Sequence, residues 1–253
     1  MPPRMTNSNT TPRLFVPDAL HQGAEIAATP AQAHHLGTVL RQGPGAPLRL
    51  FNGHEGEWAA RLASIRRDRA NLVVEHQTRP QTPEPDLWLI FAPLKRDPTD
   101  LLVEKATELG VAALLPVFTE RTTTARLTLD RLRAIATGAA EQCERLTVPR
   151  MADPQQLAAL LAAWPPNRRL VVALERDDSP PPRPHASPTA LLIGPEGGFA
   201  PHETAMLHRL TFVETASLGP RVLRAETAAI VGLALLQPPA QGYLATQAGP
   251  PAK

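Results

Sequence analysis

The sequence holds a single cysteine, Cys143, and this scarcity excludes an intramolecular disulfide framework and a cysteine cluster for zinc. No apolar run approaches the roughly 20 residues of a membrane-spanning helix. Residues 1–11 lack the apolar core of a signal peptide. His34 and His35 are adjacent, so on a helix they cannot both face one metal ion, and a capping or packing role is favoured. We therefore expect a cytoplasmic protein in a reducing compartment, without a metal site.

Two phosphate-binding motifs are also absent. The most glycine-rich turn, Gly194-Pro195-Glu196-Gly197-Gly198, is not followed by Lys-Ser or Lys-Thr and lacks the spacing Gly-x-Gly-x-x-Gly. These absences exclude a P-loop and the dinucleotide-binding fingerprint. Charge is less decisive: the formal net charge is only +2, although the pI near 9.1 leaves room for a basic face toward a polyanion.

Proline is abundant, with 29 residues in a chain of 253. Many prolines gather in residues 1–12, 79–85 and 179–188, where they exclude interior helix or sheet. These stretches indicate a tail, an interdomain linker and a surface loop. The length allows two domains. We predict the following division: a tail 1–11, a small domain 12–78, a linker 79–85, a larger domain 86–238 and a second tail 239–253.

The small domain is predicted to be a β-barrel with one inserted helix. Short strand candidates occupy 13–16, 25–27, 48–51, 57–62 and 71–75. Turn-forming Asn52-Gly53 and Gly56 separate two of them. The inserted helix is expected to begin at Thr29 as N-cap, with Pro30 in the first turn, and to run to Leu40.

In the larger domain, strand patterns alternate with helix patterns. The strands are expected at 87–92, 112–118, 170–174, 190–193 and 213–218. The helices are expected at 97–110, 127–144, 154–164, from 201 onward and at 225–237. This alternation predicts an α/β domain with a mostly parallel sheet. The pattern alone suggests an ordinary Rossmann-like strand order.

Two turns near the C-terminal end carry the strongest functional signal. The apolar residues 191–193 run directly into the turn at 194–198, which indicates a buried strand ending in a tight turn before a helix. A second such turn follows at 217–228. Glycines in these turns let backbone groups approach a ligand without an intervening Cβ atom. Because α/β proteins bind ligands where strands end, we expect both turns to build one site.

These turns match two family signatures, Ile193-Gly194-Pro195-Glu196-Gly197-Gly198 and Leu218-Gly219-x-Arg221-x-Leu223-Arg224-x-Glu226-Thr227-Ala228. The chain resembles the RsmE family of 16S ribosomal RNA uridine N3-methyltransferases, which belong to the SPOUT superfamily. Lys95 with 104–111, and Ala140-Glu141-Gln142-x-x-Arg145, also match the family. Glu104 replaces an expected glutamine and Cys143-Glu144 replaces a small polar pair, so local substrate contacts are in doubt. The resemblance covers about residues 12 to 238.

The resemblance implies a C-terminal SPOUT domain whose last segment threads through a loop to make a trefoil knot, and an N-terminal PUA-like RNA-binding domain. It implies a homodimer that uses S-adenosylmethionine and acts on 16S ribosomal RNA or the small ribosomal subunit. The implied cofactor-binding residues are Leu174, Ile193, Gly194, Pro195, Glu196, Gly197, Gly198, Leu218, Gly219, Val222, Leu223 and Thr227.

The chemistry suggests roles for three charged residues near the second turn. A uridine N3 carries a proton and is a poor nucleophile until that proton leaves. Arg221 and Arg224 are candidates to stabilise the charge that develops on the uracil ring. Glu226 is expected to hold one of these arginines or to help bind cofactor. Glu196 has two interpretations, a site residue or an N-cap or ion-pair partner. No general base is identified.

Four basic residues are candidates for RNA binding, and two other functions stay open. The candidates are Arg13, Arg41, Lys95 and Arg145. For a single arginine a solvated surface position is an alternative, and for Arg13 so is packing of its stem on the barrel. The alternative functions are a non-catalytic RNA-binding factor in ribosome assembly and a knotted ribose 2′-O-methyltransferase. Intact glycines at 194, 197, 198 and 219 argue against the first, because a dead site needs no open backbone.

Overall fold

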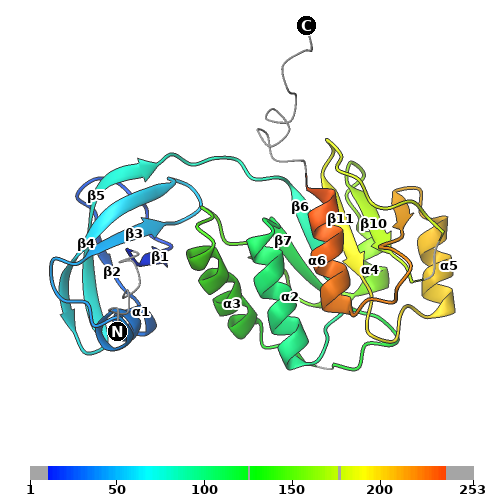
Figure 1. Ribbon diagram of the computed structural model, residues 1–253, viewed down its shortest axis with the longest axis horizontal. Coiled ribbons are helices and arrows are strands. Elements are labelled where there is room, and N and C mark those ends of the chain that lie inside the picture. The colour runs from blue at the N-terminus through cyan, green and yellow to red at the C-terminus, as the bar shows by residue number, and fades with distance from the viewer. Residues whose placement is uncertain (1–10, 125, 176–177, 238–253) are drawn as a thin grey trace, which may run out of the picture. The chain divides into compact units, whose positions relative to one another are not determined.

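The computed structural model describes residues 11–124, 126–175 and 178–237 (Figure 1). The predicted tails lie outside these residues, apart from residue 11. The chain forms two compact units. The first contains residues up to Glu84 together with Ala136–Val148, and the second contains Pro85–Ile135 and the residues from Pro149 onward. The N-terminal unit thus recruits a segment from the middle of the chain.

The first unit is built on a five-stranded sheet in the order β1-β3-β4-β5-β2. Its strands are β1 (Arg13–Phe15), β2 (Glu25–Ala27), β3 (Pro47–Phe51), β4 (Glu57–Arg66) and β5 (Arg69–Arg79). β1 pairs with β3 in parallel, while the other pairs are antiparallel. Alternate residues of the strands, such as Leu48, Leu50, Leu62 and Leu72, fill one core. All five predicted strands are confirmed.

The helix inserted after β2 begins where the sequence predicted. α1 (Pro30–His34) has Thr29 as its N-cap, and the Thr29 hydroxyl accepts a hydrogen bond from the Gln32 N–H at 3.2 Å. The Gln32 side chain accepts one from the Thr29 N–H at 3.0 Å, which completes a capping box. The predicted continuation to Leu40 is a π-helical turn, η1 (His35–Val39), with Leu40 N–H bonded to His35 O.

The second unit contains a seven-stranded sheet in which every pair is parallel. The order is β12-β10-β11-β6-β7-β8, with β9 paired to β7 off this path. The strands are β6 (Leu87–Phe91), β7 (Ala113–Phe118), β8 (Arg150–Met151), β9 (Gln155–Gln156), β10 (Arg169–Ala173), β11 (Thr189–Ile193) and β12 (Val213–Ala216). The two-residue strands β8 and β9 were not predicted, because they are too short to show a pattern.

The strand order corrects the Rossmann-like order that the pattern suggested. β11, not β10, pairs with β6, so β11 lies between β6 and β10. Both β6 and β11 are apolar along their length and almost wholly buried, which suits interior strands of a parallel sheet. Strand order alone does not define a knot, so the knot stays a prediction.

Helices cover both faces of this sheet (Figure 1). The covering helices are α2 (Arg96–Glu108), α4 (Leu157–Ala162), α5 (Pro201–Arg209) and α6 (Ala225–Leu236), and the unit also contains the start of α3 (Leu129–Gln142). α4 and α5 pack on the face that presents Leu115 and Leu192. α6 packs against α2 and β11 on the other face, where Gly232 leaves room for the Leu191 side chain. α3 begins in the second unit and ends in the first.

The helix boundaries follow the predicted ones closely. α2 ends before Gly110, whose φ of +75° is the left-handed value typical of a residue just past a helix. α4 is shorter than the predicted helix 154–164, because residues 155–156 pair with β7 instead.

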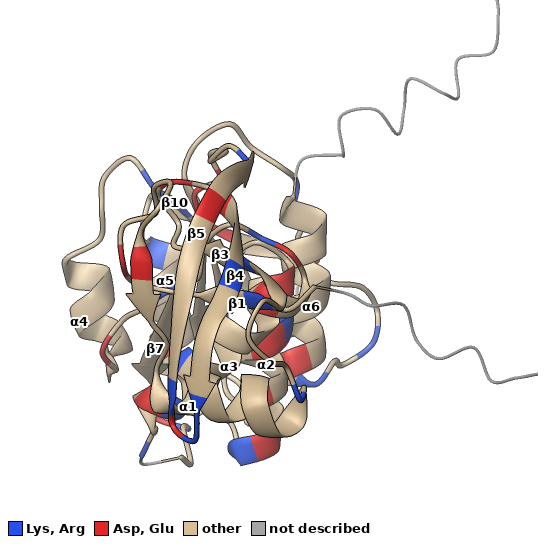
Figure 2. Ribbon diagram, turned by 90° about the vertical axis from the view of Figure 1, so that its left-hand side faces the viewer, with Lys and Arg blue, Asp and Glu red and all other residues tan. Residues whose placement is uncertain are grey.

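None of the helices in the described ranges is long and apolar enough to cross a membrane. Charged residues of both signs are interspersed in the view of Figure 2.

Candidate active site

A cavity of about 1100 Å³ lies in the second unit, at the carboxyl ends of β10, β11 and β12. Because β10 lies between β11 and β12, the segments that follow these three strands meet at one edge of the sheet. The lining includes residues 193–199 at and after the end of β11, and residues 173–175 and 178 at and after the end of β10. After β12 it includes residues 218, 219, 221–226 and 228. The two predicted turns therefore line one cavity.

The turn after β11 is shaped by two of its glycines. A Cβ atom on Gly194 would lie 2.9 Å from the ring of Phe199, which also lines the cavity. Gly198 has a φ of +68°, a conformation that residues with a side chain rarely adopt, and its N–H donates to Pro195 O at 2.9 Å. Gly197 differs, since its φ is outside the left-handed region and an added Cβ atom would meet only Arg121, at 3.8 Å. A residue with a side chain would therefore strain the backbone of this turn at position 198 rather than at position 197.

Two side chains hold this turn against the loop that follows β7. Arg121 Nη1 donates to Gly197 O at 3.0 Å. The buried carboxylate of Glu203 accepts from the N–H groups of Ala200, at 2.9 Å, and Glu120, at 3.0 Å. Glu203 lies in the first turn of α5, where a carboxylate also favours the helix dipole. These bonds fix the backbone of the turn without occupying the cavity.

The turn after β12 is more open. Gly219 has a φ of +113°, and nothing lies within 4 Å of the position of a Cβ atom there. Arg224 is the N-cap residue of α6, and its carbonyl accepts from Ala228 N–H at 2.8 Å. Arg221 and Val222 are exposed. This segment therefore presents backbone groups and two guanidinium groups to the cavity.

The structure brings almost all the predicted cofactor residues together. Leu174, residues 193–198, Leu218, Gly219, Val222 and Leu223 all line the cavity. Thr227, which is exposed on α6, does not line the cavity. The predicted catalytic residues Arg221, Arg224 and Glu226 also line it. Within the described residues Glu226 forms no ion pair with either arginine, and Glu196 is exposed without an ion pair.

Several lining residues were missed by sequence reasoning. They are Pro98, Arg121, Ala173, Glu175, Asp178, Phe199, Thr204, His208, Ala225 and Ala228. Phe199 directly follows the first motif, so extending that motif by one residue would have found it. Ala225 and Ala228 lie inside the second motif but were not assigned to the site. Pro98 and Arg121 come from α2 and the loop after β7, and no local pattern connects them with the turns.

The four predicted RNA contacts divide into two pairs. Arg41 and Lys95 are exposed. Arg13 is not: its side chain is 6% exposed, its Nε donates to Glu57 at 2.7 Å, and its Nη atoms donate to the carbonyls of Ala140, Glu141 and Arg145. These carbonyls are at and beyond the end of α3, where a cation is favourable. The geometry therefore favours a structural role for Arg13 over a phosphate contact.

Arg145 is likewise engaged within the first unit. Its side chain is 8% exposed and bonds to Glu84 and to the Thr147 hydroxyl. Nearby, Glu141 accepts from Phe15 N–H at 2.9 Å. Burial raises the pKa of Glu141 against the opposing effects of that hydrogen bond and of Arg13. The family-like segment 140–145 thus forms part of the framework of the first unit, and its geometry does not favour RNA contact by Arg145.

Comparison with known proteins defines the class. Residues 81–237 match the model of the RNA methyltransferase domain family, and residues 28–75 match that of the RNA methyltransferase PUA domain. The fold, with its cavity at the carboxyl ends of the strands, is that of an RNA methyltransferase with an attached PUA domain.

Relatives narrow this class to one family. Ribosomal RNA small subunit methyltransferase E of Rickettsia conorii is 30% identical over 88% of this chain and 93% of its own length. The Bacillus subtilis protein of the same name is 28% identical over 86% and 91%. The crystal structure of that enzyme from Neisseria gonorrhoeae, bound to S-adenosyl methionine, has a TM-score of 0.81 at 28% identity, covering 89% of this chain and 96% of the other. The chain belongs to the ribosomal RNA small subunit methyltransferase E family.

Proposed function

We propose that this chain transfers a methyl group from S-adenosylmethionine to N3 of a uridine in 16S ribosomal RNA, in the cytoplasm. The observation that carries the proposal is the cavity formed by the two glycine turns. The Neisseria gonorrhoeae relative, which is bound to S-adenosyl methionine, supports this choice of methyl donor. The position of the modified atom rests on the family resemblance of the two turn motifs.

The residues around the cavity suit this methyl donor. A volume of about 1100 Å³ exceeds what a drug-sized ligand requires. The bare backbone at Gly194 and Gly219 would hold its polar groups, while Leu174 and Ile193 add apolar surface. When bound, S-adenosylmethionine supplies an electrophilic methyl group on a sulfonium. The chain itself mainly positions the reactants and excludes water.

The two arginines of the second turn would act on the uracil. N3 must lose its proton to become a nucleophile, and the resulting negative charge spreads over the ring. Guanidinium groups at Arg221 and Arg224 would stabilise that charge, since both line the cavity. This role makes them catalytic residues in the proposal, whereas Arg121 and Glu203 are positioning residues that hold the first turn.

The proposal is tested by methyl transfer to purified small ribosomal subunits and to a 16S RNA transcript. A methyl group on N3 blocks base pairing and stops reverse transcription, and mass spectrometry of the digested RNA identifies the modified atom. A stop at one uridine with N3-methyluridine in the digest is expected. A ribose 2′-O-methyl product would support the knotted ribose methyltransferase instead. RNA binding without transfer, although S-adenosylmethionine binds, would support the assembly factor.

We further propose that the first unit binds RNA and that the active form is a homodimer. Residues 79–85 are the proposed boundary between the RNA-binding and methyltransferase domains, and Arg41 and Lys95 are the proposed RNA contacts that remain exposed. The dimer proposal rests on an apolar surface of the second unit. Leu235 on α6 is 41% exposed and Leu101 on the adjacent α2 is 40% exposed, and Ala234, which precedes Leu235, is exposed as well.

A further inference from the structure

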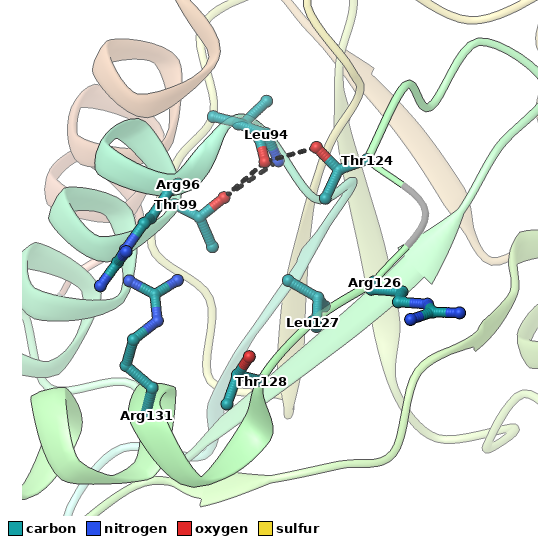
Figure 3. Close-up of a pocket in the computed structure, with 8 residues that line it drawn as sticks. All are labelled: Leu94, Arg96, Thr99, Thr124, Arg126, Leu127, Thr128 and Arg131. Carbon is teal, nitrogen blue, oxygen red and sulfur yellow. Dashed lines mark hydrogen bonds between the residues drawn. The ribbon is translucent and has the colours of Figure 1, made fainter.

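A second cavity, of about 310 Å³, lies in the second unit between the start of α2 and the start of α3 (Figure 3). Its lining is formed by three arginines, three threonines and two leucines: Arg96, Arg126, Arg131, Thr99, Thr124, Thr128, Leu94 and Leu127. None of these residues lines the larger cavity. The chemistry proposed above uses none of them.

The charge of this cavity is positive. Arg96 and Arg126 are exposed, and within the described part of the chain no ion pair involves either of them. Arg131 pairs with Asp100, which offsets its charge and holds its side chain in place. Figure 3 shows Arg131 reaching from α3 toward the start of α2, where Arg96 lies, while Arg126 lies on the other side of Leu127. The guanidiniums of Arg96 and Arg126 thus remain available to a ligand at two separate points of the lining, because the Arg126 side chain is directed away from Arg96 and Arg131 (Figure 3). Guanidinium geometry suits phosphate oxygens.

The backbone adds to the positive potential. Arg96 is the first residue of α2, and Thr128 immediately precedes α3, where its carbonyl accepts from Leu132 N–H. The N-terminal ends of two helices therefore border one cavity, and each carries a partial positive charge. The floor is rigid, because the hydroxyls of Thr99 and Thr124 both donate to the carbonyl of Leu94, at 3.0 and 2.7 Å.

This cavity adjoins the larger one through shared segments. Pro98 of α2 lines the larger cavity, and the next residue, Thr99, lines the smaller one. In the loop after β7, Arg121 lines the larger cavity and Thr124 lines the smaller one. Only a turn of helix and a short stretch of loop separate an anion in the small cavity from the site of the turns.

We propose that the small cavity and its border bind two backbone phosphates of the RNA substrate, close to the nucleotide whose base enters the larger cavity. This inference rests on the proposed function, which supplies the polyanion. Arg96 contacts one of these phosphates and Arg126, on the other side of Leu127, contacts the other. Arg131 shapes the cavity through its bond to Asp100. Such a contact would set the register of the RNA strand over the methyl-transfer site without reading its sequence.

The test is the double variant Arg96→Gln/Arg126→Gln, which leaves the Arg131–Asp100 pair intact. Its matched control is Arg183→Gln/Arg209→Gln, which removes the same charge from exposed arginines elsewhere in the second unit. RNA affinity is measured at several salt concentrations, S-adenosylmethionine affinity by calorimetry, and methyl transfer by KM and kcat. Each lost phosphate contact lowers the slope of log affinity against log salt by about 0.7 for a single strand. The double variant is therefore expected to lose about 1.4 units of slope and roughly tenfold in RNA affinity near physiological salt.

The outcomes separate this inference from the proposed function. KM for RNA should rise about as much as affinity falls, while S-adenosylmethionine affinity and the control pair stay within about twofold of wild type. A salt slope equal to that of the control pair would overturn the inference while methyl transfer by the wild type still stands. Calorimetric binding of inorganic phosphate that the double variant loses, with unchanged RNA affinity, would make this a small-anion site and also overturn it. If the wild type methylates no ribosomal RNA while the double variant still shows the reduced salt slope, only the proposed function is overturned.

Discussion

Gly219 is the residue at which backbone geometry and the proposed ligand site coincide. Its φ of +113° lies in a region that residues with a Cβ atom avoid, and it lines the larger cavity. Gly219→Ala should therefore strain or shift the turn at a cost of about 1–3 kcal/mol. Because the shift moves backbone groups that would hold S-adenosylmethionine, calorimetry should show affinity falling by about tenfold or more.

Gly138→Ala provides the matched control for this prediction. Gly138 is exposed within α3, with nothing within 4 Å of an added Cβ atom. Alanine in a helix is more stable than glycine by roughly 0.5–1 kcal/mol, so this variant should melt slightly higher and bind the ligand as the wild type does. A folded Gly219→Ala protein with unchanged affinity would remove the second turn from the site.

Arg13 and Arg41 are expected to respond in opposite ways to replacement by alanine. Arg13→Ala leaves the buried carboxylate of Glu57 without its closest buried partner, so the free energy of unfolding should fall by about 3 kcal/mol. Arg41 is exposed, and its loss should change stability by no more than about 0.5 kcal/mol. If Arg41 contacts phosphate, its variant alone should lower the salt slope of RNA binding, by up to about 0.7–0.9.

Both quantities are measured on each variant, by urea denaturation and by RNA titration at several salt concentrations. S-adenosylmethionine affinity serves as the check on the second unit and should stay constant. An Arg13→Ala protein of normal stability with a reduced salt slope would restore Arg13 as an RNA contact.

At the scale of elements, Glu57 connects four strands of the first unit. It begins β4, and its side chain, 2% exposed, accepts from Arg13 on β1, Arg49 on β3 and Thr78 on β5. Burial works to raise the pKa of Glu57, but the bonds from Arg49, Arg13 and Thr78 outweigh it and hold the pKa below its ordinary value of 4.5. The carboxylate is therefore the favoured form in the folded unit.

This shift predicts a pH-dependent loss of stability. A carboxyl with a lowered folded pKa contributes stability that is present above its unfolded pKa, near 4.5, and lost as pH falls through the folded pKa. Glu57→Gln should thus unfold about 3 kcal/mol more easily than wild type at pH 7, and the difference should shrink below pH 4.5. Glu75→Gln, from an exposed pair with Arg61, should change stability by less than about 1 kcal/mol. A Glu57→Gln difference that stays constant into strong acid would contradict the assignment.

At the scale of the whole molecule, the proposed dimer predicts a particle of twice 27.3 kDa at micromolar concentration. Leu235→Glu places a charge on the exposed apolar surface of α6, and burying that charge in an interface is unfavourable. Sedimentation should then show a single 27.3 kDa species for this variant. Val39→Glu changes an equally apolar, 60% exposed residue of the first unit and should leave association unchanged. A wild type that sediments only at the lower mass would defeat the proposal.

The sequence by itself determined most of the elements and both turns that line the larger cavity. Thr29 and Pro30 define the start of α1 because a capping bond and a fixed φ act within one turn of chain. The buried strand before Gly194 and the glycines after it are likewise readable, since burial pattern and backbone conformation are local properties. The match of these motifs to a known family supplied the prediction of S-adenosylmethionine as methyl donor and of ribosomal RNA as substrate.

The tertiary structure decided which distant segments meet. Periodicity is the same for a strand at any place in a parallel sheet, so only the fold places β11 between β6 and β10 and gathers three strand ends around the cavity. The Gly197 carbonyl receives its bond from Arg121, 76 residues earlier. Arg13 donates to carbonyls 127 to 132 residues away, and these bonds favour a structural role over the predicted phosphate contact. An arginine on a strand has the same local pattern in either role, and its role depends on the acceptors that the fold brings within reach.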